Sequence, residues 1–128
     1  MARILVVEDE KQIGDMIAFK LTNAGHQVIR ALDGEQAVTL AARELPDLIL
    51  LDAMMPGLNG FEVLRRLKSD QILRSIPVIM VTAKGHERDV LSGLRGGAVD
   101  YVVKPFSLKE LAARVDLALR KEPPATAS

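Results

Sequence analysis

Short apolar runs alternate along the chain with longer stretches in which apolar residues recur at helical spacing. Runs that are apolar throughout are typical of strands buried on both faces, and their alternation with helices is typical of parallel sheets. The pattern predicts an α/β fold, a doubly wound five-stranded parallel sheet built from five βα units. The predicted strands are residues 3–7, 26–31, 48–51, 78–81 and 101–103.

Helical periodicity and helix-end residues define the stretches between the strands. Gly25 is placed to stop the first helix, Asp33 with Gln36 to begin the second, and Ser107 with Glu110 to begin the last. A helix from about 87 to 95 is interrupted by glycine, so we expect it to be the least rigid of the five. We expect these residues to face the core: Ile13, Met16, Ile17, Leu21, Ala24, Ala37, Val38, Leu40, Ala41, Leu45, Phe61, Leu64, Leu67, Leu108, Leu111, Ala112, Val115 and Leu119.

The length of 128 residues predicts one domain, over residues 1–121, followed by a linker or disordered tail over 122–128 that begins near Pro123-Pro124. Lys plus Arg (17) balance Asp plus Glu (17), so the basic excess that drives non-specific nucleic-acid binding is absent. There is no cysteine, no apolar stretch of membrane-spanning length and no secretory signal pattern. We therefore expect a soluble, cytoplasmic protein that binds neither nucleic acid nor membrane through this domain.

Four of the predicted strands lead directly into polar residues that could handle a phosphoryl group. Glu8 and Asp9 follow the first strand, Asp52 the third, Thr82 the fourth and Lys104 the fifth. Because parallel strands end at the same edge of the sheet, we expect these side chains to meet there. Each has an ordinary explanation when taken alone. Asp9 with Gln12 fits a helix cap about as well, Asp52 and Thr82 could cap loops, and Lys104 could be solvated.

Those separate explanations do not account for three acids gathered at one edge, because the carboxylates repel one another unless a cation joins them. Mg²⁺ prefers oxygen ligands, commonly one or two carboxylates with waters and phosphate. We expect Asp9 and Asp52 to contact the ion, with the Met54 carbonyl as a third protein ligand and Glu8 acting through water. Asp52 would then be the nucleophile that forms an aspartyl phosphate, while Lys104 and Thr82 stabilise the phosphoryl oxygens.

The motifs as a set resemble the receiver domain of two-component response regulators over residues 3 to about 120, most closely the receivers of winged-helix transcriptional regulators. The matching segments are ILVVED (4–9), DLILLDAMMPGLNG (47–60), VTAK (81–84) and GAVDYVVKPF (97–106). The resemblance implies a flavodoxin-like strand order of 2-1-3-4-5 and a cis bond between Lys104 and Pro105, which would aim the lysine into the site.

The same resemblance implies roles at the matching positions. Asp52 would be the phosphoacceptor, Glu8 and Asp9 the acidic metal pair, Met54 the carbonyl donor and Lys104 the phosphate-binding lysine. Thr82 would be the switch hydroxyl and Tyr101 the aromatic that rotates inward with it. The expected partner is a histidine kinase or phosphotransfer protein, and the expected chemistry is limited to self-phosphorylation and slow autodephosphorylation.

The resemblance also implies a homodimer of the phosphorylated form, through a face that the last two helices and the last strand share. Its expected charged residues are Arg95, Asp100, Glu110, Arg114 and Asp116. Asp100 and Arg114 carry the usual signs, whereas both signs are reversed at Arg95 and Asp116, and Val90 stands where a basic partner of Glu110 would be expected. The alternative is that these residues belong to a solvated face with no binding role, since isolated surface ion pairs contribute only about 0 to 1 kcal/mol to stability.

Two other interpretations compete with the signalling one. A Mg²⁺-dependent phosphatase with an aspartyl nucleophile resembles a D-x-D-x-T motif, and Asp52-Ala53-Met54 lacks its second acid. A scaffold with a vestigial site would be missing one of the five polar residues, and none is missing. The sequence leaves open whether a DNA-binding effector domain follows the tail or whether the domain is a stand-alone regulator that binds a partner protein.

Overall fold

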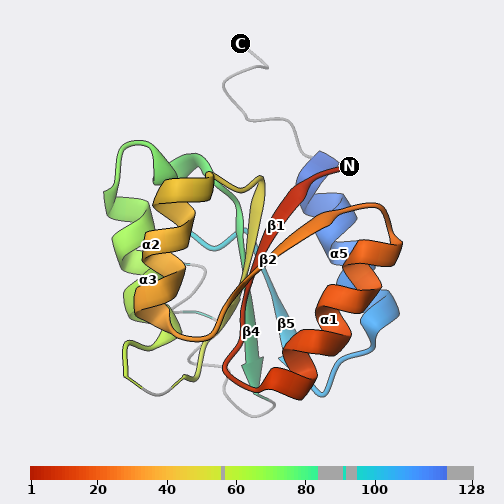
Figure 1. Cartoon of the computed structure of the whole chain (residues 1–128). Coiled ribbons are helices and arrows are strands. Elements are labelled where there is room, and N and C mark those ends of the chain that lie inside the picture. The colour runs from red at the N-terminus through yellow and green to blue at the C-terminus, as the bar shows by residue number, and fades with distance from the viewer. Residues whose placement is uncertain (56, 84–90, 92–94, 121–128) are drawn as a thin grey trace.

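The five strands form one parallel sheet in the order β2-β1-β3-β4-β5, which confirms the predicted topology. The computed structural model describes residues 1–55, 57–83, 91 and 95–120. Figure 1 shows α1 and α5 on one face of the sheet and α2 and α3 on the other. The elements are β1 (Arg3–Val7), α1 (Lys11–Asn23), β2 (Gln27–Ala31), α2 (Gly34–Glu44), β3 (Leu48–Asp52), α3 (Gly60–Ser69), the 3₁₀ turn η1 (Leu73–Ser75), β4 (Val78–Ala83), β5 (Asp100–Lys104) and α5 (Leu108–Arg120).

Alternation of side chains along the strands divides the core into two layers. Leu5, Val7, Ile49 and Leu51 pack beneath α2 and α3, whereas Ile4, Val6, Leu48 and Leu50 pack beneath α1 and α5. All five residues of the central strand β3 are buried. A strand covered on both faces needs apolar residues at successive positions, which is why these segments read as unbroken apolar runs.

Three residues predicted to face the core lie outside it, because the buried stripes are narrower than the periodicity suggests. Met16 and Leu45 are each 52% exposed, and Ala24 is exposed beyond the end of α1. In α1 the buried positions are Gly14, Ile17 and Leu21, so Met16 lies to one side of the stripe. Leu45 ends α2 with a positive φ of 48°, and the chain turns it outward.

Helix ends follow the predicted capping chemistry with one exception. The Asp33 and Ser107 side chains accept hydrogen bonds from the backbone N–H groups of Gln36 (2.8 Å) and Glu110 (2.9 Å). Gly25, with φ of 97°, follows the end of α1 as expected. The exception is Asp9. The residue that precedes α1 is Glu10, which makes no side-chain capping bond, so Asp9 is not a helix cap and remains available for the site.

Other differences concern element lengths. Strand β4 continues through Thr82 to Ala83, and η1, which the sequence does not predict, precedes it. The predicted helix over 87–95 and the predicted tail over 122–128 fall largely outside the described residues, as do Lys84 and Val90. Within the described part of the chain, no helix is long and apolar enough to span a membrane.

Lys68 connects three segments at the amino end of the sheet. Its Nζ donates hydrogen bonds to the carbonyls of Arg74 (3.0 Å) and Ile76 (2.9 Å), at the end of η1 and the approach to β4. Its methylene carbons lie over Gly97, where an added Cβ would come within 3.2 Å of Lys68 Cγ. Burial lowers the pKa of this ammonium group below its usual range. The lysine thus supports the entries to both β4 and β5.

We predict that Lys68→Met lowers the free energy of unfolding by about 1 to 2 kcal/mol, because the stem is kept and only the two hydrogen bonds are lost. Lys68→Ala should cost more, because the packing over Gly97 is lost as well. Urea denaturation measures both, with exposed Lys109→Met as the matched control. Equal stability of Lys68→Met and the control would contradict a structural role for the ammonium group.

Candidate functional site

The acidic residues predicted from the strand ends converge on one site. One carboxylate oxygen from each of Glu8, Asp9 and Asp52 lies within 4.8 Å of the others. Glu8 is 2% exposed and Asp52 4% exposed, whereas Asp9 is exposed at the rim. The register explains the convergence, because β1 and β3 pair side by side and Val7 lies opposite Leu51. The acids that follow these two residues are therefore neighbours.

Lys104 brings an ammonium group to the same place from the last strand of the sheet. Its Nζ lies 3.2 Å from Asp52 Oδ2 and 3.4 Å from Glu8 Oε1. The following peptide bond, to Pro105, is cis, as the resemblance implies. A single ammonium group therefore contacts both buried carboxylates. With all groups ionised, these three carboxylates and one ammonium group carry a net charge of −2 among the described residues of the site.

The crowding of carboxylates has a clear electrostatic consequence at Glu8. Burial, and next to it the charge of Asp52, raise the pKa of Glu8 from 4.5 to about 7. At Lys104 burial lowers the pKa, but the Asp52 and Glu8 carboxylates outweigh it and leave the pKa raised. The ammonium group is therefore held in its charged form. The electrostatic cost of the site comes from the crowded carboxylates and not from the lysine.

The loop between β3 and α3 is shaped around Asp52. The Met54 backbone N–H donates to Asp52 Oδ1 (3.1 Å), while the Met54 side chain is 57% exposed and the next side chain, Met55, is buried. A Cβ added at Gly60 would lie 2.4 Å from the Asp52 carbonyl oxygen, so only glycine fits there. A set of carboxylate oxygens with a net negative charge and an open rim fits a hard divalent cation such as Mg²⁺.

Thr82 lies on β4, which pairs with β3, and Tyr101 lies on the edge strand β5, which pairs with β4. The hydroxyl of Thr82 is buried and has no hydrogen-bond partner among the described residues, which is unusual because such groups are nearly always paired. Tyr101 is half-buried and packs against the α2–α3 layer of the core. In register, Thr82 pairs with Val103 and Met80 with Tyr101, so both residues belong to the same part of the sheet.

Sequence reasoning placed all five polar residues at this edge but missed how Glu8 is held. The role of Glu8 through water stays a prediction, and the structure adds that Glu8 is buried, contacts Lys104 and accepts a hydrogen bond from the Glu10 N–H (3.2 Å). The spacing of residues along the sequence does not predict this contact, because residues 8 and 104 come together only through the order of the strands in the sheet. The motif could identify the members of the site but not their pairing.

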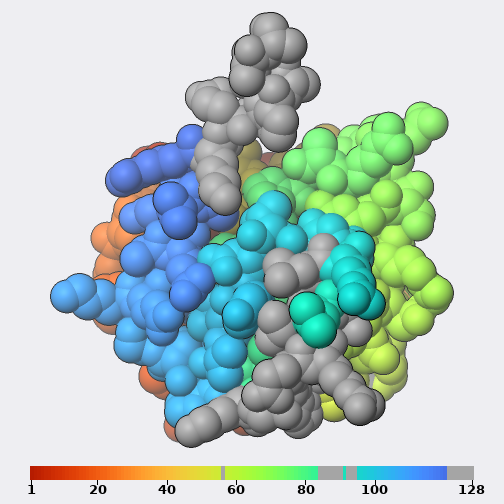
Figure 2. All heavy atoms as spheres, turned by 180° about the vertical axis from the view of Figure 1, so that it is seen from behind, coloured from red at the N-terminus to blue at the C-terminus, as the bar shows by residue number. Residues whose placement is uncertain are grey.

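Four of the five residues expected on a dimer face already contact charged or titratable groups of the same chain. Arg114 binds Asp100 of β5 (2.9 and 3.0 Å) and also contacts Glu110 (3.3 Å), whereas Asp116 lies 3.5 Å from the half-buried His26 that precedes β2. Arg95 is exposed. Figure 2 shows α5 in blue beside residues 95–104 in cyan on one face of the molecule.

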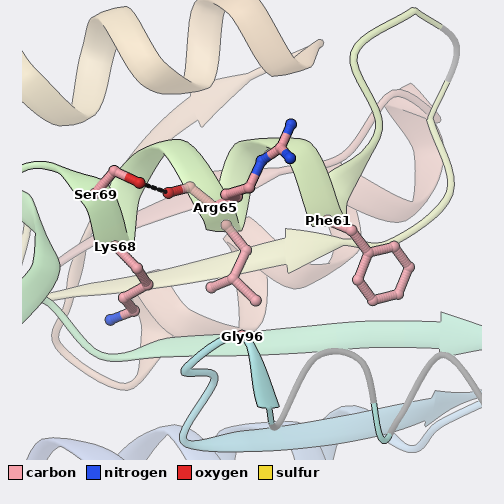
Figure 3. Close-up of a pocket in the computed structure, with 6 residues that line it drawn as sticks. Phe61, Arg65, Lys68, Ser69 and Gly96 are labelled. Carbon is pink, nitrogen blue, oxygen red and sulfur yellow. Dashed lines mark hydrogen bonds between the residues drawn. The ribbon is translucent and has the colours of Figure 1, made fainter.

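Two grooves lie on the surface of the described residues. One of about 370 Å³ adjoins the acidic site, because Lys104 lines it together with Ile13, Met16, Ile17, Pro105, Phe106 and Leu108. The other, of about 310 Å³, lies between α3 and the Gly96 turn, where Phe61 and Lys68 extend from α3 toward the Gly96 side and the Arg65 guanidinium points away (Figure 3). It contains none of the acidic residues, so the chemistry belongs to the carboxyl edge of the sheet.

Comparison with known families and sequences agrees with this geometry. A profile described as response regulator receiver domain matches residues 4–116. The chain is 48% identical over 122 residues to the phosphate regulon transcriptional regulatory protein PhoB of Escherichia coli, covering 95% of this chain and 53% of PhoB. It is 43% identical over 121 residues to the DNA-binding dual master transcriptional regulator RpaA of Synechocystis, covering 94% of this chain and 50% of RpaA. The chain thus spans about half the length of these relatives.

Solved structures share the fold over nearly the whole chain. A putative response regulator from Chloroflexus aurantiacus superposes with a TM-score of 0.90 at 32% identity and covers 94% of this chain and 98% of its own. The Vibrio cholerae chemotaxis protein CheY4 superposes with a TM-score of 0.87 at 30% identity and covers 92% and 98% respectively. Together with the acidic site, these matches show that the chain belongs to the response regulator receiver domain family of two-component signalling.

Proposed function

We propose that this domain is a phosphorylation-activated switch whose phosphoacceptor is Asp52. The observation that carries the proposal is the contact of one buried carboxylate with both an acidic cluster and the Lys104 ammonium, 3.2 Å away. A carboxylate placed only for stability would not share its pocket with two further acids, because their mutual repulsion opposes folding. A Mg²⁺-dependent phosphatase lacks support, since the exposed Met54 stands where its second acid would be.

The reaction proposed is transfer of a phosphoryl group from a histidine kinase, a phosphotransfer protein or a small acyl phosphate. A carboxylate oxygen of Asp52 forms a bond to phosphorus, the bond from phosphorus to the donor breaks, and the donor keeps that electron pair. Asp9, Asp52 and the Met54 carbonyl would hold Mg²⁺, which when bound supplies positive charge to the phosphoryl oxygens. Lys104 supplies a second positive charge at the same place, and Glu8 keeps that lysine oriented.

Thr82 is the group proposed to sense the phosphoryl group, because its buried hydroxyl has no partner among the described residues. Phosphorylation adds roughly −1.5 to −2 charges and new acceptor oxygens. Two charge-assisted hydrogen bonds, from Thr82 and Lys104, would supply about 3 to 6 kcal/mol. Driving a two-state equilibrium from 1:99 to 99:1 takes about 5.5 kcal/mol, so the supply suffices for a strong bias toward an active conformation in which Tyr101 moves inward.

The partners proposed follow from the surroundings of the site and from the relatives. The groove that Lys104 shares with α1 borders the phosphoacceptor, which makes it the surface where a phosphodonor protein would approach. Because the relatives named as transcriptional regulators are about twice as long, we place a winged-helix effector domain beyond residue 121 in a longer protein. The receiver would then act in the cytoplasm as a non-enzymatic regulator of transcription.

Incubation with acetyl phosphate and Mg²⁺ tests the proposed phosphoacceptor. Intact mass spectrometry should show one added phosphoryl group on the wild-type protein and none on Asp52→Asn, which keeps the size of the side chain but removes the nucleophile. Lys104→Met should reduce the rate of modification at least tenfold, because the phosphoryl oxygens lose one of their positive charges. Equal labelling of Asp52→Asn and wild type would exclude Asp52 as the acceptor.

The raised pKa of Glu8 predicts how the stability of the metal-free protein depends on pH. The folded-state pKa of about 7 lies above the ordinary 4.5, so the stabilisation is full below about pH 4.5 and is lost as pH rises through 7. Urea denaturation without metal should show the wild-type protein losing up to about 3 kcal/mol more than Glu8→Gln between pH 5 and 8. Saturating Mg²⁺ should restore most of this loss at pH 8. The same pH slope in both proteins would show that Glu8 ionises without strain.

Dimerisation of the phosphorylated form is proposed through α5, β5 and the segment before β5. In this arrangement Arg95 of one copy would meet Asp116 of the other, and the reversed signs would oppose pairing with related receivers through like-charge contact. Asp116 also lies 3.5 Å from His26 within the chain. In the dimer its carboxylate would exchange this neighbour for Arg95 of the other copy.

The double substitution Arg95→Asp with Asp116→Arg tests the charge pairing. We expect either single substitution to weaken the phosphorylated dimer, because two like charges would then face each other across the interface. The double exchange should restore the dimer, as measured by sedimentation. Thermal unfolding of each variant serves as the control for the lost contact with His26. A double variant that stays monomeric when phosphorylated, at unchanged stability, would argue against this pair.

A further inference from the structure

The start of α2 lies against the loop that connects β3 to α3, at a distance that excludes any side chain. A Cβ added at Gly34 would lie 2.5 Å from the carbonyl oxygen of Leu58 and 2.9 Å from both Leu58 Cβ and Val63 Cγ2. The backbone of Gly34 is not in the left-handed region, so glycine is required here by contact and not by conformation. The nearest neighbour is a backbone atom, which cannot move aside without moving the loop.

The Leu58 carbonyl belongs to a loop that is held at both ends. At its far end Asn59 caps α3 by accepting a hydrogen bond from the Glu62 N–H (3.0 Å), and the backbone of Gly60 packs against Asp52 and Ala53. At its near end the Met54 N–H donates to Asp52, and the Met55 side chain is buried in the core. The half-buried Leu58 packs against the same core. Leu58 is two residues from Gly60, whose backbone lies against Asp52 and Ala53, so a shift at Leu58 is passed to the residues beside Met54.

We propose that Gly34 is a positioning residue for the proposed metal site, because it lets the start of α2 support the loop that carries Met54. The inference rests on the proposed function, in which the Met54 carbonyl is one of the protein ligands of Mg²⁺. Ligand carbonyls bind a small hard cation well only when the surrounding structure holds them in place, and groups behind the ligands commonly change metal affinity 10- to 100-fold. Gly34 acts on the ion only through the loop.

The start of α2, where Gly34 lies, is held in place by its own capping hydrogen bonds. Asp33 fixes the first turn of α2 through its bond to the Gln36 N–H, and the Gln36 side chain accepts in return from the Leu32 N–H (2.7 Å). The helix start is therefore anchored from its own side. An added methyl group at Gly34 would press between the capped start of α2 and the Leu58 carbonyl, so the loop at Leu58 is the side that must shift.

The test compares Mg²⁺ affinity in Gly34→Ala and wild type, together with amide shifts of the metal-free proteins in two-dimensional NMR. We expect the Mg²⁺ dissociation constant from calorimetry to rise roughly tenfold or more. The amide signals of Ala53, Met54 and Asn59 should shift in the metal-free variant. Leu58→Ala removes the side chain that anchors the loop without adding an atom, and it should weaken Mg²⁺ binding as well. This variant replaces Gly34→Ala in the test if Gly34→Ala folds poorly.

Two control variants separate positioning from loss of stability. In Gly14→Ala the new Cβ meets only the end of the Arg30 side chain, which can move away, so the affinity should stay within roughly twofold. Val115→Ala opens a cavity on the opposite face of the sheet and should lower thermal stability while leaving the affinity unchanged. Wild-type affinity in Gly34→Ala with unshifted loop amides would overturn the positioning role. Absence of Mg²⁺ binding by the wild type would instead overturn the metal site itself.

Discussion

The structure depends on the burial of two carboxylates, Glu8 and Asp52, beside one lysine. Taking an ionised carboxylate out of water costs several kcal/mol unless charges and hydrogen bonds compensate for it. Here Lys104 contacts both acids, yet the exposed Asp9 adds a third negative charge at the rim. The raised pKa of Glu8 records the remaining imbalance. The fold tolerates it because the rest of the sheet is apolar and closely packed, and the imbalance is the basis of the proposed site for a divalent cation.

The proposed response to a phosphoryl group depends on donors beside these acids, because the acids themselves repel the new negative charge. The donors are the Lys104 ammonium group on β5 and the Thr82 hydroxyl on β4, which has no hydrogen-bond partner among the described residues. Both strands enter the sheet beside Lys68, which ties the end of η1 to the turn at Gly97. The amino edge of the sheet is thus held firmly, while the carboxyl edge keeps the groups that can change partners.

Glycines have two different roles in this structure. Gly60 and Gly34 are required because backbone atoms of the β3–α3 loop pass within 2.5 Å of where a Cβ would be. Gly57 and Gly97 instead have positive φ values, of 75° and 106°. The first pair sets how closely elements can approach each other, and the second pair sets where the chain can turn. The loop that carries Met54 has both kinds of position, at Gly57 and at Gly60.

Much of this protein could be predicted from the sequence, because its determinants are local or periodic. Unbroken apolar runs identify β1, β3 and β4, capping residues such as Asp33 and Ser107 mark helix ends, and polar residues at strand ends point to one edge of a parallel sheet. Contacts that depend on how helices and strands pack could not be predicted this way. The exposure of Met16 follows from the rotation of α1, and the pairing of Glu8 with Lys104 follows from strand order. The close approach of Gly34 to Leu58 follows from the packing of α2 against the loop, because such distances arise only when the whole chain is folded.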